Sequence, residues 1–213
     1  MHGFKSNQHY LQSSLDDNDI VFVQEHWLPS CYLHYLRSLY SDFVGYGRSS
    51  MDGKYETGLL RGRPYKGVAA FVRKSYKHVI SFCSSSDDDR IICLKVNVKS
   101  VNMLVFGCYV PVCYNSTQYI NSLTRLLGFV DSVISTNPGY KIYVLGDLNF
   151  ECIDSNTGFT LYKQFFDGVT DDYHIAEIFR HKFTFSGTQS LDSYDACNVV
   201  NLGEMKADVF FFC

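Results

Sequence analysis

Short apolar runs of strand length recur along this chain, and they limit its possible folds more than any other feature. Each run is rich in β-branched or aromatic residues, a composition that predicts β-strands. The runs lie at residues 20–24, 68–72, 92–98, 103–110 and 141–146. None approaches the roughly 20 residues needed to cross a bilayer, so the sequence predicts no membrane association.

The middle of the chain predicts an antiparallel hairpin. In residues 92–98, Cys93, Lys95 and Asn97 alternate with apolar side chains, a pattern typical of a strand that shows one face to water. The next apolar run follows closely, so we expect the chain to turn near Lys99.

Helical periodicity occupies segments between the strands. Residues 118–134 carry apolar side chains every three or four positions, after N-cap candidates at 115–117. Shorter helices are expected at 28–40 and 6–15. Because strands outnumber helices and pair antiparallel in the middle, the sequence predicts an α/β sandwich with helices flanking two packed sheets.

Composition and charge exclude a uniformly basic binder of nucleic acid. With 213 residues, 46% of them hydrophobic, the chain can bury the core of a single domain, residues 1–213. Charged residues make up 19% of the chain and the formal net charge is -3, unlike a histone-like protein. Any polyanionic partner must therefore be held by a local patch.

The eight cysteines include no Cys-x-x-Cys pair and no zinc-type spacing with histidine. We interpret them as free thiols of a reducing compartment. The first residues also lack the apolar stretch of a secretion signal. The sequence thus predicts a protein of the nucleus or cytoplasm that is not secreted.

Polar clusters lie at the ends of several predicted strands, and this recurrence is the main functional signal. Strand ends can aim side chains into a shared cleft. The candidates are Glu25, Tyr109, Asp147, Asn149 and Thr184, with Asp192 following the last cluster. Taken alone, Glu25 is equally a solvated strand end, and Tyr109 an ordinary core aromatic. Asp147 and Asn149 are also common turn formers.

These residue types suit phosphodiester hydrolysis. A carboxylate such as Glu25 can hold Mg²⁺, or Mn²⁺ in its place, because hard cations take oxygen ligands and neutralise phosphate charge. Asp147 could orient or deprotonate the attacking water. Tyr109 and Asn149 could donate hydrogen bonds to the non-bridging oxygens.

A basic segment at residues 54–77 supplies a candidate DNA-binding patch. It holds seven Lys or Arg residues against the single acid Glu56. We expect Arg61, Arg63 and Lys66 to follow a phosphate backbone, with a solvated loop as the alternative.

Five blocks resemble, in order, the signature blocks of the endonuclease domain of non-long-terminal-repeat retrotransposons. They are DIVFVQEHWL, KGVAAFVRK, FGCYVPV, YVLGDLNF and HKFTFSGTQSLD. These enzymes are similar to apurinic/apyrimidinic endonucleases and belong to the endonuclease/exonuclease/phosphatase superfamily. The resemblance extends from Asp19 to Asp192, about four-fifths of the chain.

The resemblance implies a four-layered α/β sandwich of two mixed, largely antiparallel sheets flanked by helices. It also implies Mg²⁺-dependent nicking of DNA that primes reverse transcription, with DNA and the reverse transcriptase domain of the parent element as partners. By the same resemblance Glu25 binds the metal. The implied catalytic residues are Tyr109, Asp147, Asn149, Thr184 and Asp192.

Departures from the family pattern lead us to expect a domain truncated at both ends, with weak or absent turnover. Family members begin with a central strand ending in Asn, shortly before a stretch like residues 2–6, where this chain opens. They close with Ser-Asp-His, whereas no histidine follows His181 and the tail from about residue 193 lacks the expected strand and loop pattern. A missing strand should expose two sheet edges, and a missing catalytic histidine costs about 10²–10⁴ in rate.

Two alternative functions stay open at this stage. One is a non-catalytic nucleic-acid-binding remnant that uses the basic segment at 54–77. The other is a phosphatase, or a phosphodiesterase that cleaves phospholipids, from the same superfamily.

Overall fold

Strands make up most of the elements, with helices interspersed among them. A computed structural model describes residues 8–51, 57–58, 66–83, 89–99, 101–110, 116–147, 160–161, 164–165, 200–202 and 205–211. In chain order the elements are α1 (Gln8–Asp17), β1 (Ile20–Gln24), η2 (Ser30–Tyr32), α2 (His34–Ser38), β2 (Phe43–Arg48), β3 (Val68–Arg73), η3 (Lys74–Tyr76), β4 (Ile80–Cys83), β5 (Ile91–Val98), β6 (Val101–Tyr109), α4 (Ser116–Ser135), β7 (Lys141–Asp147), β8 (Val200–Leu202) and β9 (Met205–Phe211). No helix in this part of the chain is long and apolar enough to span a bilayer.

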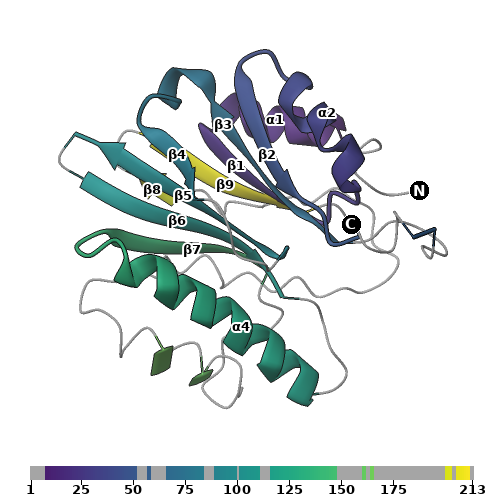
Figure 1. Ribbon diagram of the computed structural model, residues 1–213. Helices are drawn as coiled ribbons and strands as arrows, with labels where there is room; N and C mark the ends of the chain where they lie inside the picture. Colours follow the sequence, from purple (N-terminus) through teal and green to yellow (C-terminus); the bar gives the residue numbers. More distant parts are fainter. Residues whose placement is uncertain are drawn as a thin grey trace, which may run out of the picture.

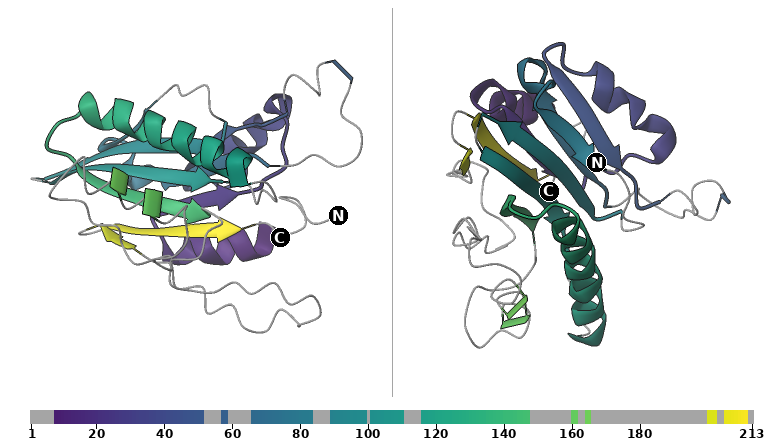
Figure 2. Two further views of the ribbon diagram at one scale, coloured as in Figure 1. Left: turned by 90° about the horizontal axis from the view of Figure 1, so that it is seen from below. Right: turned by 60° about the vertical axis from the view of Figure 1, so that its left-hand side comes forward.

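The strands form two mixed sheets that pack face to face. Sheet A has the strand order β2-β3-β1-β9-β8, and sheet B has the order β4-β5-β6-β7. β1 pairs with β9 in parallel, as β6 does with β7, and the other neighbours are antiparallel. α1 and α2 lie outside sheet A and α4 lies outside sheet B (Figures 1 and 2). This confirms the predicted four-layered α/β sandwich.

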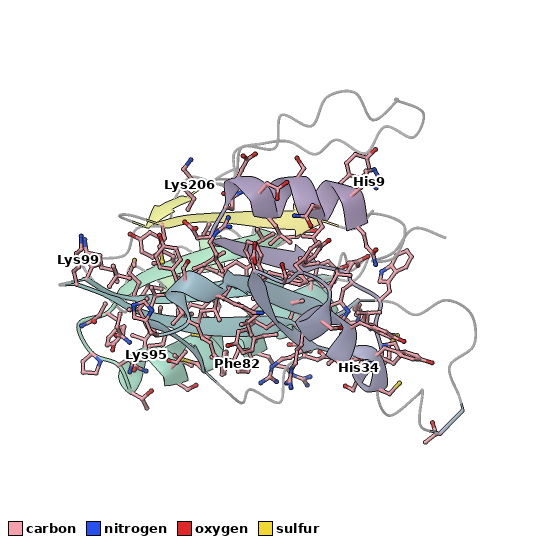
Figure 3. The ribbon with its side chains drawn as sticks, turned by 90° about the horizontal axis from the view of Figure 1, so that it is seen from above. His9, His34, Phe82, Lys95, Lys99 and Lys206 are labelled. Carbon is pink, nitrogen blue, oxygen red and sulfur yellow. The ribbon has the colours of Figure 1, made fainter. Side chains whose placement is uncertain are left out.

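All five predicted strands are present, as β1, β3, β5, β6 and β7, and their bounds differ from the prediction by at most two residues. β5 and β6 form the expected antiparallel hairpin, in which Val98 lies opposite Val101 and Lys99 adopts a φ of 51°. Lys99 marks one end of the sandwich, and His34 on α2 lies toward the other (Figure 3). The helices expected at 6–15 and 118–134 correspond to α1 and α4.

The segment 28–40 is less helical than the sequence suggests. It contains η2 and the short helix α2, which packs on β2. Glycines in β2 permit this contact, because a Cβ at Gly45 would overlap the backbone of Leu36 and one at Gly47 would overlap its side chain. The same glycines explain why the sequence did not predict β2, since glycine is depleted in strands.

The outer face of β5 is not left to water, contrary to the alternation in its sequence. Cys93 is buried because α4 covers this face, and it shares an apolar core with Leu126. Asn97, farther along the same face, is exposed, while the Lys95 ammonium donates a 2.7 Å hydrogen bond to the Asn137 side chain. A strand pattern alone cannot reveal a covering helix.

The core between the sheets has one especially close contact. The ring of Phe22 on β1 lies against the backbone of Gly107 on β6, where any Cβ would overlap it. Leu145 on β7 lies opposite Gly107 in the ladder and belongs to the same core. At the other edge of the sandwich Tyr46 stacks on Phe82, with ring centroids 5.2 Å apart. These contacts set how far one sheet can slide over the other.

β9 covers the second edge of β1. β1 pairs with β3 on one side and with β9 on the other, so both of its edges are covered. The tail from about residue 193 supplies both β8 and β9. A parallel partner far along the chain cannot be read from local periodicity.

Asp19 joins three elements at the start of β1. Its backbone N donates to the carbonyl of Lys206 on β9 at 2.9 Å, and its Oδ2 accepts from the Lys206 backbone N at 3.1 Å. Its Oδ1 accepts from Nε of Arg73 at 2.9 Å. Arg73 also donates to the carbonyls of Leu15 and Asn18 beside α1. This carboxylate therefore fixes β9 and α1 against β3.

We predict that Asp19→Ala lowers the free energy of unfolding by about 2 kcal/mol, because the Arg73 guanidinium and the Lys206 amide both lose an acceptor. Urea denaturation followed by circular dichroism measures this loss. Asp17→Ala is the matched control, since Asp17 is exposed on α1. Equal losses for the two variants would contradict the assigned role of Asp19.

Candidate functional site

Three of the predicted site residues lie where strands end on one side of the sandwich. Tyr109 ends β6 and Asp147 ends β7, and the two lie directly opposite each other in the parallel ladder. Glu25 follows the last residue of β1. β1, β7 and β9 all point toward this end of the molecule (Figures 1 and 2).

These strand ends lie on the same side of the contact between the two sheets. Phe22 touches Gly107, and Gly107 is paired with Leu145. Glu25 is three residues beyond Phe22, Tyr109 is two beyond Gly107, and Asp147 is two beyond Leu145. Each therefore lies roughly 7–10 Å farther along its strand than the residue at the contact. We refer to this region, with Glu25, Tyr109 and Asp147, as the strand-end site.

The Glu25 carboxylate is held in place by a local side-chain contact. Nε1 of Trp27 donates a hydrogen bond to Oε2 of Glu25 at 3.3 Å. Both residues have a φ of 56°, in the left-handed region that costs non-glycine residues about 1 kcal/mol or more. Backbone strain of this kind persists only where surrounding contacts hold it, and it concentrates at functional sites.

His26 supplies those contacts from inside the protein. Its Nδ1 accepts a hydrogen bond from the Leu28 backbone N at 3.0 Å, so its Nε2 carries the proton donated to the Arg48 carbonyl at 2.9 Å. Complete burial lowers the pKa of His26 from 6.5 to about 4, and the backbone hydrogen bonds oppose that shift in part. Gly67, with a φ of 92°, makes room for the ring, because a Cβ there would lie 2.5 Å from it. The sequence gives no signal for this structural role.

Within the basic segment at 54–77, the described residues Lys66 and Arg73 lie at opposite ends of β3, so these two do not share the single patch expected from sequence. The carbonyl of Lys66 accepts from the Trp27 backbone N at 3.0 Å, so Lys66 lies beside Trp27, at the same end of the sheet as Glu25. Arg73 is the last residue of β3, at the opposite end of the strand, and it pairs with Asp19. Lys74 and Lys77 follow it there. Arg61 and Arg63 lie outside the described residues.

Arg48 adds a cation at this end that sequence analysis missed. It lies opposite Val68 at the end of β2, and Val68 in turn lies opposite Gln24 at the end of β1. Its guanidinium is 5.9 Å from the centre of the Phe82 ring. The unpredicted strand β2 carries this residue, which is why no motif indicated it.

Gly146 shapes the backbone immediately before Asp147. Its φ of 136° is outside the range of ordinary L-residues, and an added Cβ would overlap the carbonyl of Cys108 on β6. Beyond it the Val110 backbone N donates to the Asp147 carbonyl at 2.7 Å. This close backbone approach places Asp147 directly beside the end of β6.

Gln24 is a second feature that the sequence did not predict. Its side chain is fully buried on the face of β1 that carries Ile20 and Phe22, and neither Oε1 nor Nε2 has a hydrogen-bond partner. Buried amides normally have partners, and leaving them without costs about 1–3 kcal/mol. An unsatisfied polar group therefore adjoins Glu25 inside the sandwich.

The oxygen donors at the strand-end site suit a hard divalent cation. Mg²⁺ is usually held by one or two carboxylates and keeps several waters, and Glu25 with Asp147 supplies that donor type. Among the described residues no group of three or more His, Cys, Asp or Glu side chains could enclose a metal. Asn149, Thr184 and Asp192 lie outside the described residues.

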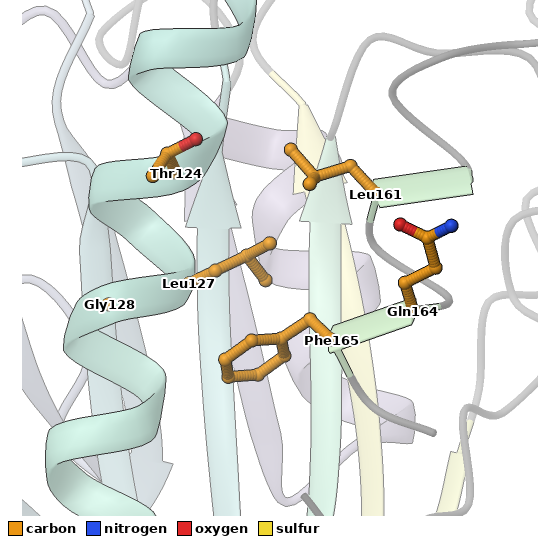
Figure 4. A pocket seen from close by; sticks show the side chains of 6 residues that line it. All are labelled: Thr124, Leu127, Gly128, Leu161, Gln164 and Phe165. Atoms are coloured by element: carbon orange, nitrogen blue, oxygen red, sulfur yellow. The ribbon is translucent and has the colours of Figure 1, made fainter. Parts of the chain in front are cut away.

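A separate hollow on the other side of sheet B contains none of these residues. It lies between α4 and residues 161, 164 and 165, has a volume of about 380 Å³ and is almost wholly apolar (Figure 4). Thr124 and Gln164 line it together with Leu127, Gly128, Leu161 and Phe165. A pocket without convergent charged groups does not suit phosphate chemistry.

We predict that His26 makes folding stability depend on pH in a defined window. Above pH 6.5 His26 is neutral in both the folded and the unfolded protein. Between pH 6.5 and about 4 it binds a proton only in the unfolded protein. Folding stability therefore falls as the pH falls through this range. The expected loss attributable to His26 is about 3 kcal/mol. Urea unfolding of wild type and His26→Gln from pH 7 to pH 4 measures it.

The variant should be less stable at pH 7 but should lose less stability on acidification. His9→Gln, at an exposed residue of α1, serves as the control and should follow the wild-type slope. Parallel pH profiles for wild type and His26→Gln would contradict a buried neutral histidine.

We also predict opposite effects for two glycine substitutions. Gly146→Ala should destabilise the protein by about 3 kcal/mol, because the new Cβ meets the β6 backbone and the φ is unfavourable. Gly128→Ala, at an open and exposed position on α4, should stabilise it by about 0.5–1 kcal/mol. Thermal unfolding separates the two, and a neutral Gly146→Ala would refute the close approach.

Comparison with known proteins supports the architecture. No protein-family model and no curated protein matches the chain. The 3′ phosphatase NExo from Neisseria, solved with a product DNA hairpin, matches at 18% identity and a TM-score of 0.53, over 78% of this chain and 67% of that one. An AP endonuclease from Archaeoglobus fulgidus matches at 17% identity and a TM-score of 0.52, over the same shares. The chain therefore shares the α/β sandwich fold of these two solved proteins.

Proposed function

We propose that the chain is a metal-dependent phosphodiesterase that nicks DNA, with the strand-end site as its active site. The observation that carries the proposal is the pairing of Tyr109 with Asp147 at the ends of two parallel strands, on the same side of the Phe22–Gly107 contact as Glu25. The fold is shared with a 3′ phosphatase solved with a DNA product and with an AP endonuclease, which supports this class of reaction.

Glu25 is the residue that would hold Mg²⁺, or Mn²⁺ in its place. A bound divalent ion supplies charge neutralisation of the phosphate and stabilises the leaving oxygen. The hydrogen bond from Trp27 restricts the Glu25 carboxylate and so reduces the cost of ordering it for this task.

The proposed chemistry at the phosphate belongs to Asp147 and Tyr109. Asp147 orients the attacking water and accepts its proton, and the Tyr109 hydroxyl donates a hydrogen bond to a non-bridging oxygen as charge develops. Asn149, Thr184 and Asp192 are proposed to complete the site, on the strength of their positions in the sequence blocks.

DNA is the proposed substrate, bound by local cations because the whole chain has a net charge of -3. Lys66 and Arg48 lie at the same end as Glu25, and Arg61 and Arg63 are proposed to extend this patch. Contacts of this kind attract the phosphate backbone without reading its sequence.

The proposal also includes a retrotransposon origin for this chain. It is supported by the order of the five sequence blocks between Asp19 and Asp192. A reverse transcriptase domain of the parent element is the corresponding partner, since a nick in the target DNA supplies the primer for that enzyme.

We predict that Asp147→Ala lowers the nicking rate by about 10²–10⁴-fold, the usual contribution of a group that handles the proton. Conversion of supercoiled plasmid to open circle in Mg²⁺, with an EDTA arm, measures it. Asp131→Ala is the matched control, because Asp131 is exposed on α4. Equal nicking by wild type and Asp147→Ala would rule out turnover at this site.

DNA binding without nicking would support the alternative of a nucleic-acid-binding remnant. In that case binding should weaken steeply with salt and should survive Asp147→Ala, while Lys66→Ala should weaken it. Fluorescence anisotropy of a labelled duplex at two salt concentrations distinguishes this outcome from loss of all DNA affinity.

A further inference from the structure

Two cysteines lie directly opposite each other on the outer face of sheet B. Cys83 ends the edge strand β4, and its partner in the antiparallel ladder is Cys93 on β5. Cys93 belongs to the core beneath α4, and Cys83 packs against that core, so both side chains are on one face. Opposed residues in antiparallel strands have Cα atoms about 4.5–5.5 Å apart, within the range that a disulfide spans.

The two thiols have unlike surroundings. Cys83 is partly exposed, whereas Cys93 is 1% exposed. The hydrogen bond from the Cys93 thiol, together with the charge of Lys95, lowers the pKa of Cys83 to about 7 against the opposing effect of burial. The same hydrogen bond, with burial, raises the pKa of Cys93. One sulfur is thus a ready nucleophile and the other a protonated partner.

Neighbouring groups reinforce the difference between the nucleophilic Cys83 and the protonated Cys93. Lys95 lies two residues after Cys93 on the same face, and it is anchored by the Asn137 side chain at 2.7 Å and by the Tyr140 ring at 4.7 Å. It is therefore a fixed positive charge beside the thiols. Cys108 on β6 lies opposite Ile91, not opposite Cys93, so it is displaced along the ladder and is the less suitable partner.

We propose that Cys83 and Cys93 are a redox modification site, in which a peroxide oxidises Cys83 and Cys93 then closes a disulfide between β4 and β5. The Cys83 thiolate attacks the peroxide O–O bond, which gives a sulfenic acid and hydroxide. The Cys93 sulfur then displaces the sulfenic hydroxyl group, which takes up the Cys93 proton and leaves as water. One peroxide is reduced by two electrons, and the two sulfurs are oxidised.

The site is separate from the proposed active site. The cysteines face α4 on β4 and β5, whereas Tyr109 packs against the core between the sheets. Closing the disulfide joins the edge strand of sheet B covalently to its neighbour, at the point where β4 ends. Oxidation should consequently stiffen this edge without removing a residue from the strand-end site.

Peptide mapping tests the proposal directly. Trypsin cleaves after Lys77, Arg90 and Lys95, which places Cys83 and Cys93 in two different peptides. After treatment of the folded full chain with hydrogen peroxide, non-reducing mass spectrometry should find peptide 78–90 joined to peptide 91–95. Thiol titration should show the loss of two of the eight thiols. Joining of Cys83 to Cys108 or Cys31 instead would overturn the assignment.

Three variants make the test specific. In Cys93→Ser, and in Cys93→Ala should the serine variant fold poorly, oxidation should stop at a Cys83 sulfenic acid that dimedone traps. Alkylation of Cys83 by iodoacetamide should also move to higher pH in these variants, because the hydrogen bond from Cys93 is gone. Cys31→Ser, at an exposed cysteine, should leave the disulfide yield unchanged. Absence of the disulfide in wild type under these conditions rejects the proposal.

Discussion

The packing of the Phe22 ring against the bare backbone of Gly107 is the contact on which the arrangement of the molecule depends. It interlocks the two sheets at one point, and packed interiors do not slide continuously past such a contact. Because β1, β6 and β7 run toward the same end, the residues that follow them lie on one side of this contact. The strand-end site is thus a consequence of core packing, and its polar groups are positioned by rigid strands.

Unusual backbone conformations concentrate at that end of the fold. Glu25 and Trp27 adopt left-handed conformations, and Gly146 adopts one that only glycine tolerates. A buried neutral His26 holds the first pair through two backbone hydrogen bonds. The opposite end of β1 is anchored differently, by the carboxylate of Asp19. The stability of the sandwich and the geometry of the site therefore depend on different ends of the same strand.

The distribution of charge follows the same division. Within one short basic segment, Lys66 lies beside Trp27 at the end of the fold that carries Glu25, while Arg73 pairs with Asp19 at the far end of β3. One cation is therefore near the strand-end site, and the other stabilises the opposite end of the sheet. Away from both, the thiols of Cys83 and Cys93 lie on the outer face of sheet B, where their chemistry can respond to oxidants while the strand-end site keeps its residues.

The sequence by itself determined the five strands, the long helix α4 and the sandwich class, because apolar periodicity is a local property of the chain. It also identified Glu25, Tyr109 and Asp147 as residues at strand ends. It did not reveal β2, whose glycines weaken the strand pattern, or the helix over Cys93. Only the tertiary structure decided that β9 pairs with β1, that Arg73 forms an ion pair with Asp19 and that Cys83 lies opposite Cys93. Each of these depends on which distant segments become neighbours, and that is decided by burial and pairing between elements rather than by any local pattern.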